Sequence, residues 1–174
     1  MGIQFETDYN METLTAMAKG LRKTVRKKRS RRVHIFAAVV LVLGLLTILD
    51  TTAGGEPLGA SGVVTLLALL LLILATVFED RLNAWFARKR LLPGTEHAAA
   101  TFEEDGYVSA TGVTESRFSY AQIVAVAETA RYFVFALSSH HTQAYDKRTI
   151  RGGSVEDFRA FIAEKTGKLV ENIK

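Results

Sequence analysis

The sequence predicts an α+β membrane protein in which a two-helix transmembrane hairpin carries a small β-sheet or barrel domain with a C-terminal helix. Three observations predict this class: two long apolar runs without charge, clusters of basic residues beside them, and a change after Pro93 to short runs rich in aromatic and β-branched residues. The 174 residues are 48% apolar and 23% charged, and cysteine is absent. This composition excludes a disordered chain, a disulfide scaffold and a thiol-based active site.

The N-terminal segment alternates apolar Ile3 and Phe5 with polar neighbours, which is the pattern of a half-buried strand. We expect residues 1–9 to form a strand that joins the cytoplasmic sheet. A basic helix over residues 11–32, capped by Asn10, should then lead into the first apolar run. This helix and the hairpin together make up a segment over residues 10–90.

Two uncharged runs predict the membrane spans. Residues 33–49 hold no charge over 17 positions, and residues 58–78 hold none over 21. As helices they would reach about 25 and 31 Å, against a hydrocarbon core of about 30 Å. We expect spans at about 33–52 and 58–78. Buried helices of a soluble protein or a secretory signal are weaker interpretations, because neither run has a polar stripe and 32 residues precede the first.

The basic residues predict the orientation of the hairpin. Eight Lys or Arg residues lie between Arg22 and Arg32 and four between Arg81 and Arg90, whereas the connection over residues 50–57 has none. The positive-inside rule then places both termini of this multi-pass protein in the cytoplasm and the short turn outside. These basic clusters could attract anionic lipid or could serve only to set topology. The side chains expected at the membrane interface are Arg29, Arg31, Arg32, Arg81, Trp85, Arg88, Lys89 and Arg90.

A β-rich cytoplasmic domain is expected over residues 95–174. Asp105-Gly106 is a hairpin signal between the first two of its strands. The runs over 123–127 and 132–137 are continuously apolar, which predicts two central strands covered on both faces. We expect strands at about 97–103, 106–111, 115–120, 122–128, 131–138 and 142–147. With the N-terminal strand, the count is about seven.

A C-terminal helix should follow these strands. Ser154 and Asp157 are spaced as a capping box, and Gly167 suits the helix end. Val155 and Phe158 begin an apolar face at helical spacing, so the helix should cover the sheet or the mouth of the barrel.

The segment from Phe118 to Ile150, FSYAQIVAVAETARYFVFALSSHHTQAYDKRTI, resembles the YcxB-like family of bacterial membrane proteins. The features that carry the resemblance are Tyr120, Ile123, the Glu128-Thr129 turn and Lys147-Arg148, with the element order of the whole chain. The resemblance implies two spans followed by a small domain like the pleckstrin-homology (PH) fold, and it implies no established activity. The polar stretch 138–142 departs from the family pattern.

The sequence contains no catalytic constellation, so we expect no enzyme, no metal and no cofactor. P-loop, GxGxxG, HExxH and EF-hand spacings are absent. The histidines are His34, His97, His140 and His141. Adjacent His140 and His141 would point to opposite faces of an extended segment and are expected in a solvated turn. A nucleic-acid partner is not expected, because the basic residues flank the apolar runs instead of covering a folded domain.

One local pattern could receive a phosphate or lipid headgroup at the N-terminus of the last helix. Acidic Glu156 and Asp157 already complement that helix end, so turn formation and capping is the alternative. The candidate contacts are Lys147, Arg148, Arg151, Gly152, Gly153 and Ser154.

These observations favour a non-enzymatic protein of the inner membrane that tethers its β-domain at the cytoplasmic face, where it binds membrane lipid or a protein partner. The alternative is a small transport or immunity-type component that works as a homo-oligomer in the membrane. Apart from His34 at its edge, neither of the uncharged runs 33–49 and 58–78 holds an ionisable residue, which counts against a transport pathway.

Overall fold

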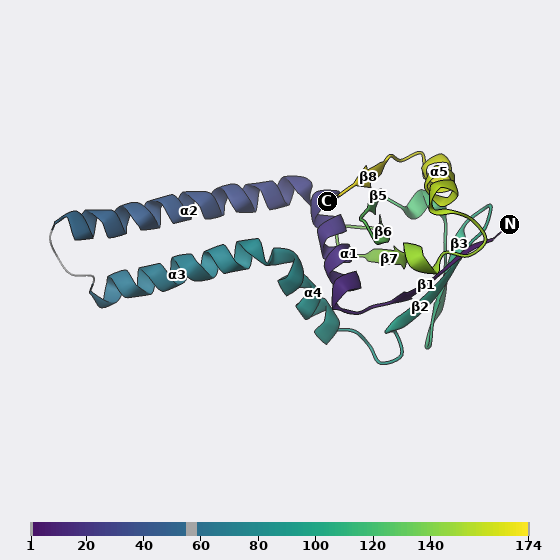
Figure 1. Cartoon of the computed structure of the whole chain (residues 1–174), viewed down its shortest axis with the longest axis horizontal. Helices are drawn as coiled ribbons and strands as arrows, with labels where there is room; N and C mark the ends of the chain where they lie inside the picture. The colour runs from purple at the N-terminus through teal and green to yellow at the C-terminus, as the bar shows by residue number, and fades with distance from the viewer. Residues whose placement is uncertain (1, 55–58, 174) are drawn as a thin grey trace.

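The computed structural model describes residues 2–54 and 59–173 and consists of a long helical hairpin attached to a β-rich body (Figure 1). Helices α2 (Lys27–Ala53) and α3 (Ala60–Val77) form the two arms of the hairpin. The connection predicted over residues 50–57 falls partly outside the described residues, as does the predicted start of the second span at residue 58.

Both arms are long and apolar enough to cross a membrane, with mean hydropathies of 2.4 and 2.6 over their most apolar stretches. Only 6% of each stretch is buried. The arms meet closely at Gly44, where an added Cβ would lie 2.7 Å from Cδ2 of Leu69. Most of the remaining apolar surface of the hairpin therefore points away from the protein.

The predicted basic helix is interrupted. Helix α1 (Met11–Lys23) ends at Thr24, and α2 begins three residues later, so the chain turns between them. Asn10 caps α1 as expected, because its side chain accepts hydrogen bonds from the backbone N–H groups of Glu12 and Thr13. The β-branched pair Thr24-Val25 suits a break in the helix.

Eight strands form two four-stranded sheets in the described residues. The first sheet has the order β1-β2-β3-β4 and is antiparallel, with Phe5 of β1 opposite Ala100 of β2. Its strands are β1 (Ile3–Asp8), β2 (His97–Phe102), β3 (Tyr107–Thr111) and β4 (Glu115–Phe118). The N-terminal strand thus lies beside the first strand that follows the hairpin.

The second sheet has the order β7-β6-β5-β8, in which β5 and β8 are parallel. Its strands are β5 (Ala125–Glu128), β6 (Tyr132–Ala136), β7 (Thr142–Asp146) and β8 (Val170–Asn172). The prediction of two central strands is confirmed, since β5 and β6 are the inner strands and every residue of β6 is buried. The strand expected from residue 122 begins only at Ala125, because Tyr120–Gln122 forms a 3-10 turn capped by Ser119.

Helix α5 (Val155–Thr166) covers the aromatic core of the body. Its Phe158 is fully buried, with ring centroids 4.6 Å from Phe5 and 4.8 Å from Phe102. The predicted capping box forms: Ser154 Oγ accepts from the Asp157 N–H and Asp157 accepts from the Ser154 N–H, each at 3.0 Å. Burial of each large side chain contributes roughly 1.5–3 kcal/mol, so this aromatic cluster contributes strongly to the stability of the body.

Candidate functional site

The junction between the hairpin and the β-body is built by α1, the start of α2 and α4 (Glu79–Lys89), which bends away from α3 at Phe78. Arg22 of α1 donates to both carboxylate oxygens of Asp80 in α4, at 2.7 and 2.6 Å. That bond to Asp80 raises the pKa of the Arg22 guanidinium. Glu79 lies 3.8 Å from Arg22 and 3.6 Å from His34 of α2. The Arg22–Asp80 ion pair therefore joins α1 to α4, and Glu79 at the same point lies within 4 Å of side chains from α1 and α2.

Helix α1 is also fixed to the second sheet. At Gly20 an added Cβ would lie 2.7 Å from Cγ1 of Val134 on β6, so only glycine allows this approach. At the other end of α1, the Thr13 hydroxyl donates to the Asp8 carbonyl at 2.6 Å and contacts the Tyr132 hydroxyl at 3.2 Å. Since α1 holds α4 on one side and β6 on the other, it mounts the β-body on the hairpin.

A cavity of about 1010 Å³ opens at this junction. Four arginines line it, beside the histidines of the β6–β7 loop: Arg22, Arg26, Arg29 and Arg90. Its apolar lining comes from α1, from Phe86 and Ala87 of α4, and from the first apolar residue of α2, Val33. The cavity thus combines cationic and apolar walls at the base of the hairpin.

The loop between β6 and β7 closes one side of the cavity. The Arg26 guanidinium donates to the Ser139 carbonyl at 2.6 Å and to His140 Nδ1 at 2.9 Å. The Ser138 hydroxyl accepts from the backbone N–H groups of His140 and His141, which fixes the turn. His140 and His141 are exposed, as expected for a solvated turn, but the loop is also held against the turn between α1 and α2.

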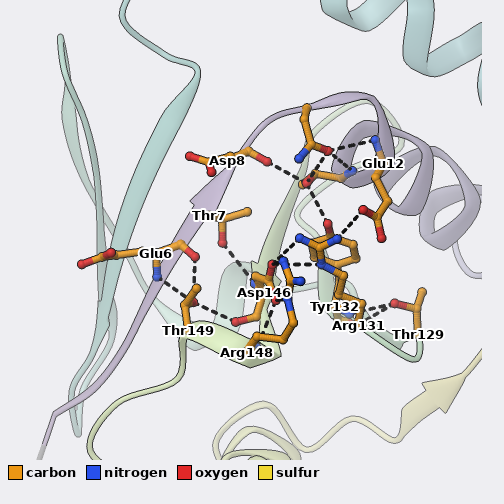
Figure 2. A network of polar contacts seen from close by, with 12 residues as sticks. Glu6, Thr7, Asp8, Glu12, Thr129, Arg131, Tyr132, Asp146, Arg148 and Thr149 are labelled. Carbon is orange, nitrogen blue, oxygen red and sulfur yellow. Dashed lines mark hydrogen bonds and ion pairs between the residues drawn. The ribbon is translucent and has the colours of Figure 1, made fainter.

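A second polar network joins the N-terminal segment to the end of β7, around the buried Asp146 (Figure 2). Arg131 and Arg148 both donate to Asp146 Oδ2 at 3.0 Å. Arg131 also pairs with Glu12 of α1, and the Thr7 hydroxyl accepts from the Asp146 N–H at 3.1 Å. This arrangement ties α1, β1 and β7 together and leaves no carboxylate oxygen of Asp146 without a donor.

A third network surrounds Glu128, which is 4% exposed. Arg159 of α5 donates to its two oxygens at 2.7 and 2.8 Å, and Lys147 donates to it at 2.5 Å. The bonds from Arg159 and then Lys147 outweigh the opposing effect of burial and lower the pKa of Glu128 to about 2. The carboxylate is therefore a structural anion between β5 and α5.

Comparison with protein families identifies the region that holds the two buried carboxylates, Asp146 and Glu128. Residues 102–162 match the family model described as YcxB-like protein. The chain carries a YcxB-like region. The predicted resemblance is thus confirmed, and the YcxB-like region extends from the end of β2 into α5. The comparisons with curated proteins and with solved structures found no match. The likeness to the PH fold stays a prediction.

The candidate anion contacts all lie within the YcxB-like region, at the turn before α5. Lys147 is bonded to Glu128 and Arg148 to Asp146, while Arg151 is largely exposed, 3.5 Å from Glu6. Gly152 has a φ of +83°, and an added Cβ there would lie 2.6 Å from the Gly2 carbonyl oxygen. Gly153 follows it, and Ser154 is the N-cap of α5. Anion binding at this turn stays a prediction, and two of its three cations already hold buried carboxylates.

The residues predicted for the membrane interface gather on α4 and the first turns of α2. Trp85 and Phe86 are 44% and 51% exposed, and Lys89 Nζ lies 3.7 Å from the centre of the Trp85 ring. The remaining members are exposed arginines on the same two helices: Arg29, Arg31, Arg32, Arg81, Arg88 and, at the end of α4, Arg90.

No metal site emerges from residues 2–54 and 59–173, since no group of three or more potential ligands comes together there. His97 lies instead 2.7 Å from the exposed Asp8, and His34 lies beside Glu79. The junction cavity is a feature that sequence reasoning missed, because its arginines come from segments 61 residues apart, at Arg29 and Arg90.

Proposed function

We propose that the protein is a non-enzymatic integral protein of the bacterial inner membrane that holds its β-body, with the YcxB-like region, at the cytoplasmic face. There the body binds anionic lipid or a protein partner. The observation that carries this proposal is the attachment of α1 to both parts of the molecule, which we call the mount. Helix α1 is bound to α4 by the bidentate Arg22–Asp80 pair and packed on β6 through Gly20. A body fixed in this way has a defined distance and orientation with respect to the bilayer.

The exposed surface of the hairpin supports insertion into a membrane. Phe36, Val64 and Leu71 are 70%, 64% and 66% exposed, and apolar side chains surround both arms. A soluble monomer rarely leaves an apolar surface of this size in water, whereas lipid covers it without cost. Both arms satisfy their backbone hydrogen bonds internally as helices, which a membrane span requires.

The distribution of charge supports the orientation. The basic clusters, one from the end of α1 into the first turns of α2 and one along α4, lie at the end of the hairpin next to the β-body (Figure 1). By the positive-inside rule that end faces the cytoplasm, and the body lies there with it.

Two measurements test this proposal. Insertion predicts that the full chain stays with the membrane in alkaline carbonate and is released only by detergent. For orientation, the chain offers a cysteine-free background, so single cysteines can be labelled with a membrane-impermeant maleimide. Ala53→Cys, at the end of α2, should react in intact cells, whereas Leu169→Cys, 88% exposed in the body, should react only after the membrane is permeabilised.

The unmodified chain is the control, because it should not be labelled in either condition. Release of the chain by carbonate would contradict insertion. Labelling of Leu169→Cys in intact cells would contradict the cytoplasmic position of the body.

A further inference from the structure

We propose that the junction cavity binds an anionic phospholipid of the cytoplasmic leaflet, with Arg29 and Arg90 as the ligands of its phosphate. This inference rests on the proposed function for the position of the cavity at the bilayer. It goes further by assigning one class of ligand to one set of residues.

The charge of the cavity requires an anion. Among the residues that the structure describes, the Arg29 and Arg90 side chains have neither a hydrogen bond nor an ion pair. Arg26 donates only to neutral groups, the Ser139 carbonyl and His140, so its charge is not compensated either. The cavity's carboxylate, Glu79, is shared with Arg22. Three positive charges thus face one space, which favours a phosphate.

The apolar lining selects a lipid over a small soluble anion. Met17 of α1 is half-buried in this lining, and the side chains of Val33 of α2 and Phe86 of α4 are 55% and 51% exposed. A free phosphate would leave these groups in contact with water, whereas an acyl chain would cover them. The ligand therefore needs a phosphate and an attached apolar chain.

The position along α2 agrees with this assignment. Arg29 lies about one helical turn before Val33, where the uncharged run begins, and both line the cavity. Lipid phosphates lie just outside the hydrocarbon, so they occupy the level of Arg29 when Val33 is at the hydrocarbon edge. The volume of about 1010 Å³ holds a headgroup with the upper part of its chains.

The test is native mass spectrometry of the full chain in a mild non-ionic detergent, titrated with dioleoyl phosphatidylglycerol or dioleoyl phosphatidylcholine. The unmodified chain should retain the anionic lipid at least about tenfold more tightly, because only that lipid leaves a net charge for the arginines. The double variant Arg29→Gln/Arg90→Gln should lose that preference. The matched control Arg31→Gln/Arg88→Gln removes two exposed charges from the same helices that do not line the cavity, and it should change binding less than about twofold.

Three outcomes would overturn the assignment. Equal loss of the preference for phosphatidylglycerol in both double variants would mean that general surface charge attracts the lipid. Equal retention of both lipids by the unmodified chain would contradict the choice of an anionic lipid, because phosphatidylcholine carries the same phosphate without a net charge. Displacement of phosphatidylglycerol by millimolar inorganic phosphate, with the same dependence on Arg29 and Arg90, would make the ligand a soluble phosphate. Carbonate extraction of membranes that carry the same variants, done before detergent is added, separates these results from failure of membrane insertion. A chain that stays membrane-bound but shows no lipid preference contradicts only the assignment of the cavity.

Discussion

Acidification should weaken the β-body through one carboxylate, Glu128. Its pKa of about 2 in the folded protein, against an ordinary value of 4.5, corresponds to about 3 kcal/mol of stabilisation by Arg159 and Lys147. Because the folded-state pKa is lowered, this stabilisation is complete above about pH 5 and is lost as the pH falls toward 2. Little of the carboxylate is exposed, so solvent screening reduces this contribution only slightly.

The variant Glu128→Gln isolates the effect. At pH 7 its free energy of unfolding should lie about 3 kcal/mol below that of the unmodified chain, and at pH 2.5 the difference should fall below about 1 kcal/mol. The assay is urea unfolding of the full chain in non-ionic detergent, followed by the near-ultraviolet circular dichroism of the buried tyrosines.

Glu156→Gln is the matched control, since Glu156 is 75% exposed and only 3.8 Å from the same Arg159. It should change stability by less than about 0.5 kcal/mol at any pH. If the difference in free energy of unfolding between Glu128→Gln and the unmodified chain stayed constant from pH 7 to 2.5, Arg159 and Lys147 would not be stabilising the ionised carboxylate.

Three further substitutions test the mount and the turn before α5. Gly20→Val should push α1 away from Val134 and lower the stability of the body by about 1–3 kcal/mol, measured by the same urea unfolding; an unchanged midpoint would contradict the close approach. Asp80→Asn should weaken the contact between α1 and α4 by about 1–3 kcal/mol and speed tryptic cleavage near Arg22, without releasing the chain from membranes. Unchanged cleavage would show that the Arg22–Asp80 pair does not hold the two helices together. Gly152→Ala should lower the free energy of unfolding by about 1–3 kcal/mol in the same assay, because the φ of Gly152 is positive and the Gly2 backbone occupies the space that a Cβ would need. An unchanged free energy of unfolding would show that the turn can relax.

The local signals in the sequence predict most of the body. Continuous apolar runs identify β5 and β6 as inner strands, and Ser154 and Gly167 mark the two ends of α5. Each of these features depends on residues close together in the chain. Strand β8 was not predicted, because only Val170 among its three residues is apolar and its pairing with β5 joins segments more than 40 residues apart.

The polar networks and the cavity could not be predicted from sequence for the same reason. The partners of Glu128 lie 19 and 31 residues away, and Arg22 meets Asp80 across 58 residues. Charged side chains at such distances carry no periodic signal that would indicate a pairing. The break at Thr24 was also missed, since a run of good helix formers surrounds it and only packing on β6 fixes the direction of α1.

The pairing of charges differs between the β-body and the base of the hairpin, and this difference affects which part of the protein would contact a membrane surface. Of the nine Lys and Arg residues in 91–174, six lie within 4 Å of a carboxylate: Arg131, Lys147, Arg148, Arg151, Arg159 and Lys165. Of the eight between Arg22 and Arg32, all within the described residues, only Arg22 has such a partner. The body therefore compensates most of its own cations internally, while the positive charge at the base of the hairpin remains free. We therefore expect anionic lipid to be attracted to the base of the hairpin and not to the body, and Arg26 and Arg29 of the junction cavity are among these free cations.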